Sequence, residues 1–408
     1  MNVRRSAAAL AAIGVLAAAA PAMAADATPS PSPTVPVPAG LFGKADPTYD
    51  GVWRQSLALL AQHTVGERPA ASAVQWLTGQ QCADGGFAAF RADTATPCGG
   101  KGPLADTNST AAAVQALAAL GGHDDVVGKA TKWLTGQQNK DGGWGYSPGS
   151  PSDANSTSVV VGALAAAGLD PAKQHAKGKA PAEALAALAI PCGKDGGGAF
   201  AYQPDKKGKL AANADATAAA VLGALGKGFV VEPAKARDKA PACTDSGKAT
   251  PGRAADNAAA YLAGAVAKSG HLMSAMPGAE DQPDFGNTAD TVVALAADGW
   301  SAQAKAPYAW LEKNAGPWAQ QSGPAAYAQL ILAAHALGEN PKEFGGTNLV
   351  QVLDKQGPAP EQAKKAAAAH KAEEKKESNH EVWWFVGSCL FAGIGAGFLA
   401  SGRKKNRT

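Results

Sequence analysis

The stretch that decides the fold runs from Trp133 to Leu169 and reads WLTGQQNKDGGWGYSPGSPSDANSTSVVVGALAAAGL. It holds a glycine turn, Asp141-Gly142-Gly143-Trp144, and then a polar cluster, Asp153-Ala154-Asn155-Ser156-Thr157, which opens an apolar run. Versions of this unit recur between residues 50 and 350. Such recurrence indicates a repeat protein, because each unit buries its apolar face only against its neighbours.

Two kinds of helix are predicted to alternate through residues 48–356. One kind is apolar on nearly every side, which is typical of a helix that is buried all round. It is expected near Asp50 and at 106–120, 153–167, 213–225, 287–297 and 322–337. The other kind is amphipathic and is expected at 68–81, 124–138, 181–189, 252–267, 303–314 and 341–353. Six such pairs are enough to close an all-α ring of inner and outer helices, an α/α-toroid of about six hairpins. A straight solenoid would satisfy the same alternation.

The N-terminus predicts export. Residues 1–24 have a basic start, an apolar middle and small residues at the cleavage positions, which is typical of a secretory signal peptide. The pair Arg4-Arg5 also fits twin-arginine export, but an ordinary Sec signal is the simpler reading. Residues 25–47 are rich in Pro, Ser and Thr and are predicted to be a linker.

The C-terminus predicts an anchor. Residues 357–381 alternate Lys, Ala and Glu and read as a charged stalk. Residues 382–401 are apolar and long enough to span a bilayer, and residues 402–408 form a basic tail suited to the cytoplasmic side. A sortase signal is the competing reading, but no Leu-Pro-x-Thr-Gly-like motif precedes this segment. The expected product is a single-pass protein of the cell membrane, with its body outside the cytoplasm and its C-terminus inside.

Charge gives no support for a nucleic-acid partner. Without the six basic residues of the two termini, 31 Lys and Arg face 34 Asp and Glu, so the exported part is mildly acidic. Nucleic-acid binding depends on neutralising phosphates with basic side chains.

Four of the five cysteines lie in the part expected outside the cytoplasm, where oxidation is permitted. Pairing of nearest neighbours gives the disulfides Cys82–Cys98 and Cys192–Cys243. A zinc site is the alternative, but no Cys-x-x-Cys spacing or nearby His supports one. We therefore predict no metal and no obligatory cofactor.

The glycine turns are predicted to be structural. Paired glycines allow a tight turn, whose amides can donate to the preceding carboxylate, and the following aromatic ring can wedge between hairpins. The residues of this motif are Gln81, Asp84, Gly85, Phe87, Gln138, Asp141, Gly142 and Trp144. A catalytic role for Asp141 is disfavoured, because the turn recurs in three copies.

The segment Gln138-Asn139-Lys140-Asp141-Gly142-Gly143-Trp144 resembles the QW motif of squalene and hopene cyclases. The alternating hairpins resemble the toroid that these cyclases share with protein prenyltransferase β-subunits and with the intrinsic factor/transcobalamin group. The resemblance covers roughly residues 50–355 and implies the fold. These relatives cyclise terpenes, prenylate cysteines or bind cobalamin, so it leaves the function open.

The catalytic motifs of the two enzyme groups are absent from the sequence. No Asp-x-Asp-Asp acid motif occurs, and no cysteine has an acidic residue two places before it, as the prenyltransferase zinc site requires. Aromatic residues, which stabilise carbocations in a cyclase cavity, make up only 6% of the chain. We therefore predict no catalytic residues.

A polar motif, [Asp/Asn]-x-[Asn/Asp]-x-Thr, opens four of the apolar helices. Helix capping explains each copy alone. In a ring, however, all inner helices begin at the same end, so the copies would also form a polar collar around one mouth, suited to a polar ligand group or a cation. The residues of this predicted collar are Asp106, Asn108, Asp153, Asn155, Asn213, Asp215, Asn287 and Asp290.

A loop that interrupts the pattern supplies three more candidate ligand contacts: His271, Met273 and Met276. Methionines adapt to a ligand's shape, although an ordinary surface loop fits as well.

The combined prediction is a membrane-anchored binding protein. By resemblance to the transcobalamin group, cobalamin is the most concrete ligand, handed on to a membrane transporter. No β-rich second domain follows residue 355 to close over it. The alternatives are a terpenoid cyclase-like enzyme with a displaced acid and a protein-interaction module of the cell envelope.

Overall fold

The computed structural model describes residues 36–361 except 101, 177, 246–249 and 275–280. All of them belong to the first of the two units into which the chain divides, Met1–Ala363. The predicted signal peptide, residues 25–35 of the linker, most of the stalk, the membrane helix and the basic tail lie outside the described residues. Within the described residues, no helix is both long and apolar enough to cross a membrane.

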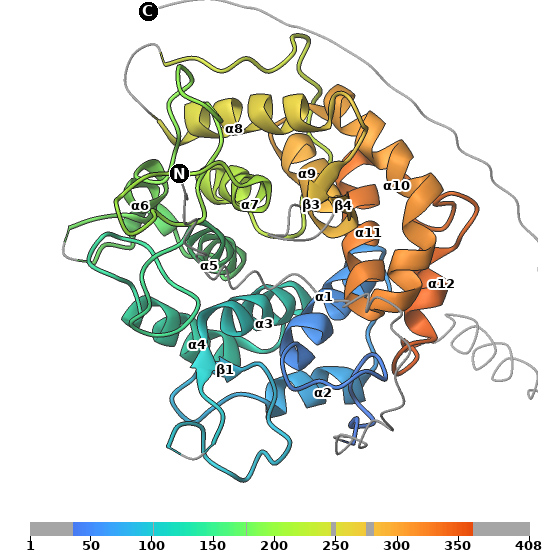
Figure 1. The fold of residues 1–408 in the computed structure, drawn as a ribbon. Coiled ribbons are helices and arrows are strands. Elements are labelled where there is room, and N and C mark those ends of the chain that lie inside the picture. The colour runs from blue at the N-terminus through green and yellow to red at the C-terminus, as the bar shows by residue number, and fades with distance from the viewer. Residues whose placement is uncertain (1–35, 101, 177, 246–249, 275–280, 362–408) are drawn as a thin grey trace, which may run out of the picture. The chain divides into compact units, whose positions relative to one another are not determined.

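Twelve α-helices alternate between an inner and an outer position in the described part (Figure 1). The inner helices are α1 Gly51–Thr64, α3 Thr107–Leu120, α5 Ala154–Ala166, α7 Ala214–Leu225, α9 Phe285–Ala297 and α11 Pro324–Leu337. The outer helices are α2 Ala71–Gly79, α4 Asp124–Gly136, α6 Pro181–Ala186, α8 Pro251–Val266, α10 Ser301–Ser322 and α12 Leu349–Asp354. A short 3-10 turn, η1 Pro171–Lys173, precedes α6.

The inner helices form a closed ring. Each packs against the next inner helix, and α11 packs against α1, so the blue and orange ends of the ribbon meet in Figure 1. Closure excludes the straight solenoid, and the arrangement is that of an α/α-toroid. The inner helices are lined mainly with buried Ala, Val and Leu, as expected for helices that pack on nearly every side.

Three helix boundaries differ from the prediction. α10 continues through Pro307 and Pro317 to Ser322, because Ala315 and Ala319 remain buried against the ring. α12 begins only at Leu349, since Gly345 and Gly346 turn the chain with φ of 54° and 84°. α6 ends early, at Ala186.

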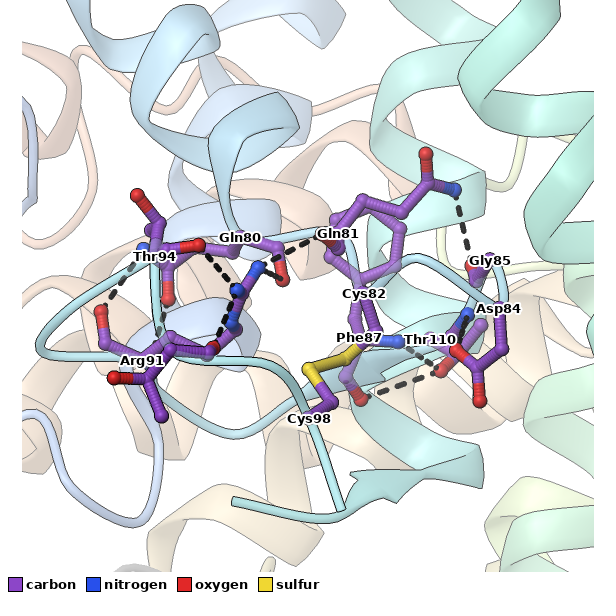
Figure 2. The surroundings of a disulfide bond; sticks show 12 residues. Gln80, Gln81, Cys82, Asp84, Gly85, Phe87, Arg91, Thr94, Cys98 and Thr110 are labelled. Carbon is purple, nitrogen blue, oxygen red and sulfur yellow. Dashed lines mark hydrogen bonds between the residues drawn. A yellow bond between two sulfur atoms is a disulfide. The ribbon is translucent and has the colours of Figure 1, made fainter. Parts of the chain in front are cut away.

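Two of the three glycine turns are fixed by their own side chains. The Asp141 carboxylate accepts from the Gly143 amide at 3.0 Å, and the Gln138 side chain donates to the Gly142 carbonyl at 2.7 Å. Gly142 has φ of 92°, and a Cβ there would lie 2.4 Å from the Ala180 carbonyl oxygen. Asp84, Gly85 and Gln81 form the same contacts in the preceding turn (Figure 2). These turns hold each hairpin against the next.

A buried threonine then ties each turn to an inner helix. The Thr157 hydroxyl accepts from the Trp144 amide at 3.0 Å and donates to the Trp144 carbonyl. Thr110, Thr217 and Thr288 accept in the same way from the amides of Phe87, Phe200 and Leu272, at 2.8, 2.9 and 3.0 Å. All four threonines are 0% exposed. We call this contact the threonine clasp.

Backbone pairing accompanies each clasp. The strands β1 Phe87–Ala88 and β2 Ala105–Asp106 are antiparallel, as are β3 Leu272–Ser274 and β4 Gln282–Asp284. The amides of Asp153 and Asn213 donate to Trp144 and Phe200, each at 3.0 Å. The clasp therefore recurs in equivalent geometry at the start of α3, α5, α7 and α9.

The two predicted disulfides, Cys82–Cys98 and Cys192–Cys243, are confirmed. Figure 2 shows the first beside the Thr110 clasp and the buried Arg91, whose guanidinium donates to the Gln81 carbonyl at 2.8 Å. Each disulfide closes a long loop outside the inner ring.

Replacing a clasp hydroxyl by a methyl group tests its contribution. Thr157→Val keeps the shape of the side chain but leaves the buried Trp144 amide without its acceptor. We expect a loss of about 1 to 3 kcal/mol in the free energy of unfolding, measured by denaturant titration. Thr135→Val, on α4 and away from any clasp, is the control. An equal loss in both variants would contradict the role of the clasp.

Candidate functional site

The first residues of the polar motif are used for helix capping. Asp106, Asp153 and Asn213 each accept from the amide three residues later, all at 2.7 Å. Asp106 and Asp153 are 5% and 0% exposed, and burial raises the pKa of both carboxyl groups to about 6. These side chains lie inside the wall of the ring, so they are poorly placed to contact a ligand in the lumen.

The fourth copy of the motif lies three residues earlier than predicted. Asp284 caps α9, and Thr288 makes the clasp. The prediction that Asn287 opens this helix is wrong: its amide and side chain donate to the Asp284 carboxylate at 3.0 and 2.7 Å. Asp284 is therefore the counterpart of Asp106, and Gly286 occupies the middle position.

The middle residues of the motif face the centre of the ring. Asn108 lies seven residues before Gln115, and Asn155 lies seven before Gly162, so each pair shares one helix face. Gln115 and Gly162 contact the segment 227–233, which enters the ring from α7. Asn108 and Asn155 therefore point into the same central space, about 10 Å nearer the N-terminal ends of the helices.

The segment 227–233, which we call the plug, fills the C-terminal side of this lumen. Its contacts on five other inner helices are Trp53, Gln115, Gly162, Ala297, His335 and Gly338. The Phe229 amide donates to Gln115 Oε1 at 2.8 Å, and its ring packs edge-on against Trp53 at 5.4 Å. Gly162 and Gly228 approach so closely that a Cβ on Gly162 would lie 2.7 Å from Gly228 Cα. The plug thus extends from the C-terminal ends of the inner helices to Trp53, in the first turn of α1.

Five polar side chains, one from each of five inner helices, lie near the N-terminal ends of these helices. We call them the luminal ring: Asn108, Asn155, Asp215, Asp290 and Gln329. Two hydrogen bonds join neighbouring helices within it: Asn155 Nδ2 to Asp215 Oδ2 at 2.6 Å, and Gln329 Nε2 to Asp290 Oδ1 at 2.8 Å. All five residues are partly exposed, although the helices that carry them are mostly buried.

The two carboxyl groups of the luminal ring are hard to ionise. Burial raises the pKa of Asp290 to about 7, with smaller contributions from the charges of Asp215 and Asp284. Burial also raises the pKa of Asp215, and Asp284 adds to the effect. The hydrogen bonds that Gln329 and Asn155 donate lower the pKa values of these carboxyl groups. Both donors are neutral amides, so they do not compensate the negative charge of an ionised carboxylate. A hydrogen-bond donor or a cation in the lumen would offset the cost of ionisation.

The luminal ring also contains acceptor atoms without partners. In the described part of the chain, Asn108 Oδ1 and Asn155 Oδ1 are buried and accept no hydrogen bond. Buried polar atoms are nearly always paired, so two unpaired acceptors at the same level of the ring require a partner, such as a water molecule or a ligand group. Together with the two carboxyl groups, these atoms give the site more acceptors than donors.

The loop candidates lie apart from most of the luminal ring. His271 stacks on Trp310 at 4.1 Å, and the stack continues through Phe285 to Trp318. Met273 is 46% exposed, on β3. Met276 lies outside the described residues. The stack approaches the ring only at Gly286, which lies near both Trp318 and Gln329.

Sequence reasoning missed Gln329, Trp53 and the plug. Gln329 had a usable signal, because it is a lone polar residue in the apolar run from Ala325 to Ala334. The plug had none, since its contacts join residues as far apart as Gln115 and Phe229.

The pKa of Asp290 predicts how stability changes with pH. Between about pH 4 and 7 the folded state keeps a proton that the unfolded state has lost, because the ordinary pKa is 3.8. The stability that Asp290 contributes is therefore lost as the pH rises through about 7. Asp290→Asn mimics the neutral acid, so its free energy of unfolding should rise relative to the wild type between pH 5 and 8. Asp281→Asn, at an exposed site, should show no such trend, and a flat difference for Asp290→Asn would refute the assignment.

One known protein family is similar to part of this chain. Residues 54–237 match the family model of the squalene-hopene cyclase C-terminal domain, which covers less than half of the chain. No curated protein sequence gives a significant match.

Three solved structures illustrate the similarity. The ent-copalyl diphosphate synthase from Streptomyces platensis is 16% identical with a TM-score of 0.46; 70% of this chain aligns with 50% of that one, so the chain spans about half its length. The type II terpene cyclase MstE from Scytonema, solved with geranylgeranyl dihydroxybenzoate, is 11% identical with a TM-score of 0.43, covering 71% and 88%. A protein from Actinoplanes is 16% identical with a TM-score of 0.33, covering 70% and 99%.

These identities and scores are too low to transfer an activity. The family match falls on the part that contains α1, α3, α5 and α7 of the inner ring and the glycine turns that suggested the resemblance. Residues 54–237 are therefore similar to the squalene-hopene cyclase C-terminal domain, and the described part of the chain has the α/α-toroid fold that this resemblance implied.

Proposed function

We propose that this protein is a ligand-binding toroid and that the luminal ring is its binding site. The observation that carries the proposal is the pair of buried, unpartnered acceptors, Asn108 Oδ1 and Asn155 Oδ1, at the same end of the inner helices as two carboxyl groups. A site for which only packing mattered would gain stability by replacing these side chains with apolar ones.

The chemistry of the luminal ring favours a ligand that donates hydrogen bonds. Amide, hydroxyl and ammonium groups would each satisfy Asn108 and Asn155, and an ammonium group would also offset the ionisation of Asp215 and Asp290. Cobalamin, the ligand that the resemblance to the transcobalamin group implies, carries several carboxamide groups around its corrin ring. We therefore keep a corrinoid as the concrete ligand, docked on the N-terminal mouth by such groups.

The plug supports binding at the mouth over enclosure of a long substrate. Phe229 packs against Trp53, which lies in the first turn of α1, so the plug reaches the level of the luminal ring. In our proposal, the apolar segment 382–401 anchors the body outside the cell, and a membrane transporter receives the ligand. The segment itself lies outside the described residues.

Cobalamin binding is tested with the purified full-length chain by size-exclusion chromatography, following the absorbance of cobalamin. We expect comigration at micromolar concentration. Asn108→Ala should weaken binding about 5- to 10-fold, which corresponds to the loss of one hydrogen bond, without loss of stability, because Asn108 Oδ1 has no partner in the described protein.

The matched control is Asn314→Ala, at an exposed asparagine on α10. Equal affinity in Asn108→Ala and Asn314→Ala would reject the luminal ring as the site. If cobalamin does not bind, native mass spectrometry of the protein from its own host identifies another ligand. The absence of any retained ligand would reject the binding function.

One observation favours a second function, a terpenoid cyclase-like enzyme with a displaced acid. With a pKa of about 7, Asp290 remains largely protonated in mildly acidic solution and faces the lumen. A carboxylic acid kept neutral by its surroundings can donate a proton. Incubation with squalene or geranylgeranyl diphosphate, followed by mass spectrometry of the extract, distinguishes this function. Cyclised products that Asp290→Asn fails to make would establish it, and unchanged substrates would reject it.

A further inference from the structure

A small cavity lies in the wall of the ring, at the start of α3. Asp106, which caps α3, and Tyr146 both line it, and the Thr107 amide donates to the Tyr146 carbonyl at 2.9 Å. None of the five residues of the luminal ring lines it, so the cavity is a separate feature. It has a volume of about 210 Å³ and is lined from four segments of the chain: residues 48, 89–90, 103–106 and 146–147.

The cavity is present because one side chain differs between two successive repeats. Residues 146–148 (Tyr-Ser-Pro) and 202–204 (Tyr-Gln-Pro) occupy equivalent places, and their tyrosine carbonyls accept from the first amides of α3 and α5 at 2.9 and 3.1 Å. In the later repeat, Gln203 Nε2 donates to the Pro151 carbonyl at 2.9 Å. In the earlier repeat, Ser147 takes the place of this glutamine, and its side chain is too short to span the same gap. The cavity is the space that is left.

The walls of the cavity are largely apolar. They include Phe90 and Leu104, and Leu104, the counterpart of Pro151, is 73% exposed. A ligand with an apolar body would cover part of this leucine and gain from the burial. The cavity is smaller than the roughly 300–1,000 Å³ of sites for drug-sized ligands, so it fits a single ring or a short branched chain.

The polar groups of the cavity are suited to accept hydrogen bonds. Asp106 is 5% exposed, and its Oδ1 accepts from the Ser109 amide at 2.7 Å. A carboxylate has about four acceptor positions, so others remain for a ligand. The Thr48 hydroxyl donates its one proton to Asp46 Oδ1 at 2.6 Å, which leaves its oxygen as an acceptor. No lysine or arginine is among the described residues that line the cavity. A buried carboxylate is costly unless it is paired, and an ammonium group supplies both the opposite charge and three donors.

We propose that this cavity is a binding site for a small primary amine with an apolar body. The ammonium group donates to the Asp106 carboxylate and to the hydroxyl oxygen of Tyr146, and the apolar body packs against Phe90 and Leu104. An alcohol of the same shape would leave the carboxylate without a counter-charge, and a carboxylic acid would be repelled by it. The site functions independently of any ligand in the lumen.

The test is the binding of 2-phenylethylamine to the full-length chain at pH 7.5, followed by saturation-transfer NMR of the ligand. Burial raises the pKa of Asp106 only to about 6, so its carboxyl group is ionised at this pH. For a ligand of this size we expect a dissociation constant of about 1 mM. The uncharged 2-phenylethanol should bind about 10-fold more weakly, because charge-assisted hydrogen bonds are the stronger ones, and phenylacetate should not bind. Equal binding of the amine and the alcohol would overturn the proposal.

Two substitutions locate the bound amine. Ser147→Gln introduces the side chain that spans the gap in the next repeat, and Asp106→Asn keeps a helix cap but removes the charge. Each should weaken amine binding about 10-fold, with a thermal unfolding midpoint within about 2 °C of the wild type.

The matched control is Asp153→Asn, the same change at the cap of α5, where Gln203 spans the gap. It should leave amine binding unchanged. An amine bound to the carboxyl groups of the luminal ring instead would keep its affinity in Ser147→Gln. That result, or an equal loss in Asp106→Asn and Asp153→Asn, would contradict the site. Cobalamin binding is measured separately, so its failure would not affect this result.

Discussion

The threonine clasp is the contact on which the rest of the structure depends. The threonine hydroxyl is fully buried between the backbone of a turn and the first turn of an inner helix. It accepts a hydrogen bond from an amide of the turn, and it donates to a carbonyl of the turn or of the helix start. An unpaired amide in this place would be costly, so the helix start and the turn cannot shift relative to each other. Four inner helices therefore begin in equivalent positions, and the residue two places before each clasp threonine reaches the same level of the lumen.

This geometry divides the polar motif by position. The first residue caps the helix inside the wall, the last makes the clasp, and only the middle residue is free to face the centre. Asn108, Asn155 and Asp215 reach the luminal ring in this way, and Asp290 and Gln329 complete it from the second turns of their helices. The plug enters from the opposite side and reaches Trp53 in the first turn of α1, so the polar groups lie around the N-terminal mouth of the ring. Burial there raises the pKa of Asp290 to about 7, so the charge of a bound ligand can change the protonation state of this carboxyl group.

Much of this was readable in the sequence. Alternating apolar and amphipathic helices predicted the ring, and neighbouring cysteines predicted both disulfides. The sequence predicted one collar from all residues of the polar motif, but it did not separate the capping residues from the middle ones. The fourth copy was misplaced because Asn287-Thr288 and Asp290-Thr291 match the pattern as well as Asp284 and Thr288 do. Only the contact between Thr288 and Leu272 distinguishes the two registers. The plug depends on contacts between distant segments, such as Gln115 with Phe229, which no local pattern encodes.

Amide hydrogen exchange of Phe87, Trp144, Phe200 and Leu272 tests the central claim most directly. If the clasp fixes each turn to its helix, these four amides should exchange as slowly as amides inside the inner helices, although they lie in turns and very short strands. In Thr157→Val, only Trp144 should lose its protection, while Phe200 keeps it. Exchange of the four wild-type amides as fast as that of exposed loops would contradict the account.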